Sequence, residues 1–197
     1  SSYININIPL KISTYLFGDY GFFNYLCSMK KLLTILLLST LAFVGRSQTP
    51  LDYEIFKVVN EYRSSRGLVS WTWSQELFPM SLNHSNYMVL KNDIGHNQDV
   101  DVPNFDECYS LNNRFVRFGI DWLTGGENVA VINCDGLSHN KDMAKKVLRM
   151  WINSPTHHEL LLSTNYKYAV VSARYSDTWV KYKGSDFWNY ITLNVYR

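Results

Sequence analysis

The end of the chain, from residue 168 to residue 196, most narrows the folds that this sequence can adopt. It contains three runs rich in Val, Tyr, Trp, Thr and Ile, a composition that favours β-strands, at 168–175, 178–183 and 187–196. A Gly-Ser-Asp turn joins the last two runs. The runs predict an antiparallel meander in which alternate residues share a face of each strand. On the last strand these residues are Phe187, Ile191, Leu193 and Val195.

Helical signals dominate the residues before these strands. Thr49-Pro50 provides a cap and a first-turn proline, and apolar residues follow at helical spacing until Gly67. Ser74 can cap a second helix that runs to about Asn92, in which His84 is predicted to lie on the helix surface. Helices followed by an antiparallel sheet predict an α+β fold.

The start of the chain carries the pattern of an export signal. Met29-Lys30-Lys31 is followed by an almost unbroken apolar run, 32–44, and by small residues at Gly45 and Ser47. This order of charged, apolar and small residues is typical of a secretory signal peptide, here residues 29–47. Because the apolar run is short for a bilayer span, a single-pass anchor is only the alternative interpretation.

The mature protein is therefore predicted to be one secreted domain, residues 48–197, and residues 1–28 are interpreted as an extension upstream of the native start. Loss of residues 1–47 removes four positive charges and one negative charge, so the whole-chain net charge of +2 becomes −1. A domain with this balance offers no basic field to nucleic acid or to an anionic membrane. We expect an extracellular or cell-surface partner, or a small ligand, instead.

Two cysteines, Cys108 and Cys134, remain in the mature domain once Cys27 is removed with the leader. In an exported protein, two cysteines favour a disulfide between them. Two unpaired buried thiols are the alternative. No Cys-x-x-Cys pattern supports a zinc site built from cysteines.

One histidine stands in an unusual position late in the chain. An amphipathic helix is predicted to end near Trp151, and Ser154-Pro155 then starts a new helix with a cap residue and a first-turn proline. His157 follows in the first turn, where the positive end of the helix dipole disfavours the charged imidazolium. A neutral ring can bind a metal or accept a proton. A simple hydrogen bond to a neighbouring loop is the alternative role.

A second unusual position is Glu127, which follows a double glycine where the chain enters a strand-like segment. The glycines allow a tight turn or the close approach of another part of the protein. Since a polar or charged group buried without a partner costs several kcal/mol, Glu127 requires partners. A third candidate, His96, is predicted to lie in the loop after the second helix.

The order of these motifs resembles the CAP superfamily, or SCP-domain proteins, which includes cysteine-rich secretory proteins, insect venom antigen 5 and plant pathogenesis-related proteins. The motifs that carry the resemblance, over about residues 51–197, are His96, Gly126-Glu127-Asn128-Val129-Ala130, Trp151 and Ser154-Pro155-x-His157. The match is closest to the bacterial-type branch with its motif Trp-x-x-Ser-Pro-Gly-His-Arg, from which Thr156 and His158 depart. The resemblance implies a three-layer α-β-α sandwich with a central antiparallel sheet.

The resemblance also implies a surface cleft lined by His96, Glu127 and His157, with Asn128 and Ser154 beside them. Two neutral imidazoles and one carboxylate form an incomplete zinc shell, which leaves a position open for water. Animal and plant relatives carry a Glu where Ser154 stands and a second cleft His in a late strand, where this chain has Tyr-Ile-Thr. The sterol and lipid binding of those relatives is therefore not expected here.

Three functions are compatible with such a cleft. The first is a secreted binding module that holds zinc, another divalent metal or a small ligand. The second is an extracellular, peptidase-like hydrolase in which Glu127 acts as general base and His96 and His157 hold the metal. The third is a structural cleft without a ligand. No nucleophile elbow and no His-Glu-x-x-His helix supports the hydrolase, so the binding module is favoured.

Overall fold

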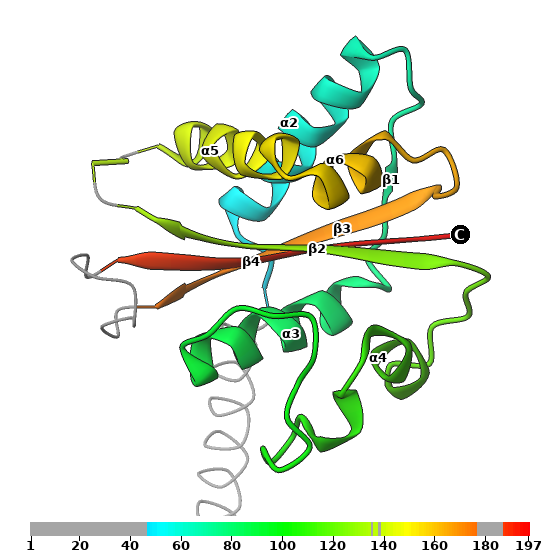
Figure 1. The fold of residues 1–197 in the computed structure, drawn as a ribbon, viewed down its shortest axis with the longest axis vertical. Coiled ribbons are helices and arrows are strands. Elements are labelled where there is room, and N and C mark those ends of the chain that lie inside the picture. The colour runs from blue at the N-terminus through cyan, green and yellow to red at the C-terminus, as the bar shows by residue number, and fades with distance from the viewer. Residues whose placement is uncertain (1–46, 135, 138, 177–186) are drawn as a thin grey trace, which may run out of the picture. The chain divides into compact units, whose positions relative to one another are not determined.

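The computed structural model describes residues 47–134, 136–137, 139–176 and 187–197 (Figure 1). The predicted leader, up to residue 46, and the predicted strand at 178–183 lie outside these residues. No helix among the described residues is long and apolar enough to cross a membrane. The elements, in chain order, are α2 (Pro50–Ser65), β1 (Thr72–Trp73), α3 (Phe78–Lys91), η1 (Asp106–Cys108), α4 (Leu111–Arg117), β2 (Gly125–Asn133), α5 (Asn140–Asn153), α6 (Pro155–Leu162), β3 (Tyr168–Ser176) and β4 (Trp188–Tyr196).

The strands form one sheet in the order β1-β3-β4-β2. Strand β4 lies in the middle and pairs antiparallel with both β2 and β3, so that Thr192 faces Val129 on one side and Ser172 on the other. The predicted antiparallel strands are therefore confirmed where the chain is described. Strand β1 adds a short parallel pair at the edge of β3. It was not predicted because its two residues are too few to show an alternating pattern.

Helices cover both faces of the sheet (Figure 1). Helices α2, α5 and α6 lie on one face, and α3 and α4 lie on the other. The largest apolar core is buried under the first group and includes Ile191, Leu193 and Val195, the face predicted for the last strand. Two smaller clusters fill the space under α3 and α4. This arrangement confirms the three-layer α-β-α sandwich.

Local signals set the ends of α2 and α3. Thr49 and Asp52 form a capping box at the start of α2, with Pro50 in the first turn. Helix α3 begins at Phe78, later than predicted, because the Ser74 hydroxyl accepts the N–H of Leu77 in the turn that precedes the helix. Its end, next to the left-handed Asn92, agrees with the prediction.

The double glycine at the start of β2 serves a close approach rather than a tight turn. A Cβ on Gly125 would lie 2.6 Å from the ring of Phe115 in α4, and a Cβ on Gly126 would lie 2.7 Å from Leu160 in α6. Neither glycine has a positive φ. The missing side chains therefore let one helix from each face pack directly against the first residues of β2.

The predicted disulfide is wrong, because Cys108 and Cys134 are not bonded to each other. Cys108 is buried in η1, which packs against α4. Cys134 follows β2, packs against the core that lies under α2 and α5, and accepts a hydrogen bond from Asn189 at 2.9 Å. The two sulfur atoms are thus held in different layers of the sandwich.

Candidate functional site

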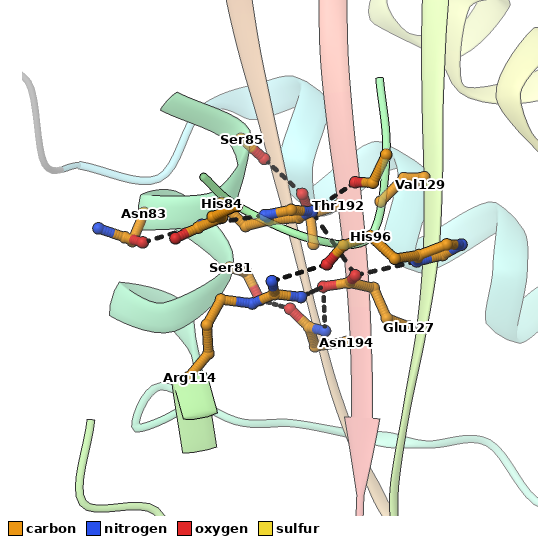
Figure 2. A network of polar contacts seen from close by, with 12 residues as sticks. Ser81, Asn83, His84, Ser85, His96, Arg114, Glu127, Val129, Thr192 and Asn194 are labelled. Atoms are coloured by element: carbon orange, nitrogen blue, oxygen red, sulfur yellow. Dashed lines mark hydrogen bonds and ion pairs between the residues drawn. The ribbon is translucent and has the colours of Figure 1, made fainter. Parts of the chain in front are cut away.

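Glu127 is the centre of a buried polar network on β2 (Figure 2). Its side chain is only 2% exposed. One carboxylate oxygen, Oε2, accepts from Arg114 at 2.6 Å and from Asn194 at 2.9 Å. The other oxygen, Oε1, accepts from His96 Nδ1 at 3.0 Å. The partners that the sequence required for this carboxylate are therefore present, and they occupy both of its oxygens.

His96 lies in the loop after α3, as predicted, with half of its side chain exposed. Because a carboxylate can only accept, the Nδ1 of His96 carries a proton, and Nε2 is the ring nitrogen that Glu127 does not engage. The ring extends away from Glu127 with this second nitrogen at its far end (Figure 2). A carboxylate bound to one imidazole nitrogen fixes the tautomer and makes the other nitrogen a stronger metal ligand.

His157 lies in the first turn of α6, as predicted, and its ring centre is 6.4 Å from that of His96. Asn128 holds this turn against β2 by donating to the His157 carbonyl at 2.9 Å. The pKa of His157 is lowered by burial and by the nearby His96 ring. The direction agrees with the prediction, and burial of the ring is the largest cause.

Ser154 ends α5 and begins α6, and its side chain makes no capping hydrogen bond. Its carbonyl accepts the N–H of His158 at 2.8 Å. The predicted restart of the helix is confirmed, while the contribution of Ser154 comes from its backbone. Asn128 is therefore the predicted neighbour whose side chain shapes the site.

Two buried residues of the network were missed from the sequence. His84 was predicted on the helix surface, which is wrong, since it is fully buried and its Nε2 lies 3.6 Å from Glu127 Oε1. Its position four residues after Met80 and four before Met88, both buried, is the helical signal that could have placed it in the interior. Arg114, also fully buried, lies in a short helix with no comparable signal.

The network pairs the buried carboxylate of Glu127 with the buried guanidinium of Arg114. Burial lowers the pKa of His84 to about 4, so the ring is neutral near pH 7. Burial alone raises the pKa of Glu127, but the charges of His84 and Arg114 and hydrogen bonds from His96 and Asn194 outweigh it and lower the value to about 2. Since His84 is uncharged near pH 7, Arg114 is the partner that keeps Glu127 ionised there.

A pocket of about 320 Å³ opens beside this network. It lies between the His96 loop and the start of α4, and its walls are His96, Asn97, Ser110, Leu111, Asn112 and Glu127. In the part of the chain that the structure describes, no group of three or more His, Cys, Asp and Glu side chains is arranged to hold a metal. Because Glu127 is engaged by Arg114 and His96 Nδ1 by Glu127, Nε2 of His96 and the ring nitrogens of His157 are the candidate metal ligands at this place.

The family model for the CAP, or cysteine-rich secretory protein, family matches residues 56–194, and the chain belongs to this family. A curated relative is the uncharacterized membrane protein YlbC of Bacillus subtilis (strain 168). It is 27% identical over 120 residues, which cover 60% of this chain and 30% of that protein. The chain thus spans less than a third of the length of this relative.

Two solved structures share the fold. An extracellular protein containing an SCP domain from Bacillus anthracis str. Ames superposes with a TM-score of 0.52 and 23% identity, over 77% of this chain and 44% of that one. An outer surface protein from Borrelia burgdorferi superposes with a TM-score of 0.52 and 16% identity, over 73% of this chain and 90% of that one. At these identities the likeness shows the fold alone.

Proposed function

We propose that this CAP-family protein is an extracellular binding module that takes a divalent metal or a small ligand through His96, which lines the pocket, and through His157, whose ring centre lies 6.4 Å from that of His96. The observation that carries the proposal is the hydrogen bond of His96 Nδ1 to Glu127 at 3.0 Å. This bond places a proton on Nδ1 and leaves Nε2 as the nitrogen for a ligand, in a residue that lines the pocket. The nitrogens of His157 lie nearby in a half-buried ring whose pKa is lowered, which favours its neutral form.

An extracellular location is supported by two independent features. The pattern at residues 29–47 is that of a secretory signal peptide. The structures that share the fold come from proteins described as extracellular and as an outer surface protein. The relative from Bacillus subtilis is described as a membrane protein, so a form anchored at the cell surface is the second version of this proposal.

The donor set fits a metal held by two imidazoles better than the three-ligand shell expected from the sequence. A Zn–N bond of about 2.0–2.1 Å places each ring centre roughly 3 Å from the ion. The ring centres of His96 and His157 are 6.4 Å apart and would have to approach each other by about 1 Å to bind one ion at a tetrahedral angle. Glu127 would act on the metal through His96, because its own oxygens are occupied. The bound ion would supply positive charge and open positions for a further ligand.

The test is a titration of the purified protein with zinc and with magnesium, followed by thermal unfolding. Binding to the folded state stabilises it by about 2.7 kcal/mol at a hundredfold excess over the dissociation constant. We expect zinc to stabilise the parent, and His96→Ala and His157→Ala to lose the response. His139→Ala, at an exposed histidine outside the site, is the matched control. An absent zinc response in the parent would refute a metal site and leave an organic ligand or a structural cleft.

The second candidate is a hydrolase, and the structure changes which residue would be its base. Glu127, whose pKa is lowered to about 2 and whose oxygens are occupied, is a poor proton acceptor. The Glu127–His96 pair instead resembles the arrangement in which a carboxylate orients an imidazole base. Hydrolysis of model esters and peptides that disappears in His96→Gln but persists in His139→Ala would support this alternative.

A further inference from the structure

His84 contacts the loop that carries His96 on both sides of that residue. Its Nε2 lies 2.8 Å from the carbonyl oxygen of Gly95, and its Nδ1 lies 3.0 Å from Gln98 Nε2. A carbonyl can only accept, so Nε2 carries the proton and donates it to Gly95. In the neutral ring Nδ1 then accepts from the Gln98 amide. Both nitrogens of this buried ring are therefore used, and neither is available to a ligand.

The loop is held at successive residues by side chains from α3 and α4. His84 binds the Gly95 carbonyl, and Arg114 donates to the His96 carbonyl at 2.9 Å. Gln98 is fixed by His84, and it also donates to Asn83 at 3.1 Å. The side chain of Gln98 is almost completely buried, whereas that of His96 is about half exposed. The loop is thus anchored from beneath, with the His96 ring on its accessible side.

We infer that His84 is a positioning residue, which holds the loop on both sides of His96, through the Gly95 carbonyl and the Gln98 side chain, so that His96 Nδ1 meets Glu127 and Nε2 is presented to the pocket. The expected effect of His84 on metal binding rests on the proposed function. Its expected effect on the His96 ring does not. It explains why a histidine, with one donor and one acceptor on a rigid ring, occupies the interior of α3. Ring packing against Tyr87, with centres 6.2 Å apart, needs neither nitrogen.

The two hydrogen bonds of His84 can be separated by substitution. In His84→Gln, the amide of the longer side chain can replace Nε2 as the donor to Gly95. In His84→Asn, the oxygen of the shorter side chain can replace Nδ1 as the acceptor for Gln98. His84→Ala removes both interactions, and His139→Ala, at an exposed histidine, is the control. Each full-length variant is compared with the parent by imidazole ¹⁵N NMR and by titration with zinc alone.

We expect His84→Ala to lose the His96 signal of the Nδ1–H tautomer and to bind zinc roughly tenfold to a hundredfold more weakly, the cost usual for residues that orient a ligand. His84→Gln should restore the tautomer and most of the affinity, because Gly95 is adjacent to His96. If His84→Ala does not fold, the comparison of His84→Gln with His84→Asn decides the question. Equal signals and equal affinities in these two variants and the parent would overturn the inference.

The NMR signal separates this inference from the proposed function. If the parent binds no zinc, the metal site is refuted, but the His96 tautomer in the variants still tests the positioning role. If zinc binds equally to the parent and to a folded His84→Ala with an unchanged His96 signal, the metal site stands and the positioning role is refuted. A purely structural His84 would lower thermal stability in all three variants without changing the His96 signal at low temperature.

Discussion

Arg114 Nη2 lies 2.6 Å from Glu127 Oε2, and both side chains are buried. This ion pair stabilises the buried carboxylate, because it supplies the positive charge that Glu127 needs inside the protein. Because Glu127 is bound to Arg114, it is not free to bind a metal. Its effect on a ligand in the pocket would act through its hydrogen bond to His96. The sequence motif suggested Glu127 as a metal ligand. In the fold, Glu127 instead holds the imidazole of His96 by a hydrogen bond.

Removal of Arg114 should destabilise the protein severely. Arg114→Ala leaves Glu127 as a buried charge without its strongest partner, and a broken buried pair of this kind costs about 3–5 kcal/mol. Chemical denaturation measures the change. Arg117→Ala, in the same helix and paired with Glu107 on the surface, should change stability little. Equal losses of unfolding free energy in the two variants would show that the buried pair stabilises the protein no more than the surface pair does.

The same site should make the protein sensitive to acid. Below the ordinary pKa of 6.5, an unfolded His84 takes up a proton that the folded ring, with a pKa of about 4, refuses, so stability falls as the pH falls through this window. Glu127 affects the free energy of unfolding below its ordinary pKa of 4.5. Its stabilising contribution is fully present above that value and is lost as the pH falls towards about 2. Urea unfolding between pH 7 and pH 4 should show a loss of a few kcal/mol. The slope should flatten above pH 5 in His84→Gln, and an unchanged slope would contradict the assignment to His84.

Gly126→Ala should disturb the packing between β2 and α6. The new Cβ would lie 2.7 Å from Leu160 Cδ1 and 3.0 Å from the hydroxyl of Tyr166, so the Leu160 side chain, on the helix that carries His157, must move. Overpacking of this kind costs about 1–3 kcal/mol. Thermal unfolding and zinc titration should both be affected. Gly95→Ala, where a Cβ meets nothing within 4 Å, is the control for stability; a larger stability loss at Gly95 than at Gly126 would rule out the steric explanation.

Cys108 and Cys134 should be distinguished by alkylation of the native protein. Cys108 is buried and its pKa is raised by burial, whereas Cys134 is partly exposed. Without reductant, a maleimide reagent should label Cys134 first, and Cys108 should react only after denaturation. Peptide mapping by mass spectrometry identifies the labelled residues. A peptide that contains both cysteines joined by a disulfide would contradict the structure.

Elements with strong local patterns were predictable. Thr49 and Pro50 specify the start of α2 through a cap and a fixed φ, and Ile191, Leu193 and Val195 identify the buried face of β4 by their alternation. These signals work because they depend on residues that are close in sequence. Strand β1 was missed since only its pairing with β3 makes it a strand.

The sequence by itself determined the α+β class, the ends of several helices and strands, the family motifs, and the expectation that Glu127 would require partners. Only the tertiary structure decided which residues those partners are. Arg114 and His84 come from helices on one side of the sheet, and His96 comes from the loop between them. Their meeting at one carboxylate depends on packing between segments that are distant in sequence. The same packing separates the two cysteines. Cys108 lies in η1, beside α4, and Cys134 packs against the core on the opposite face of the sheet.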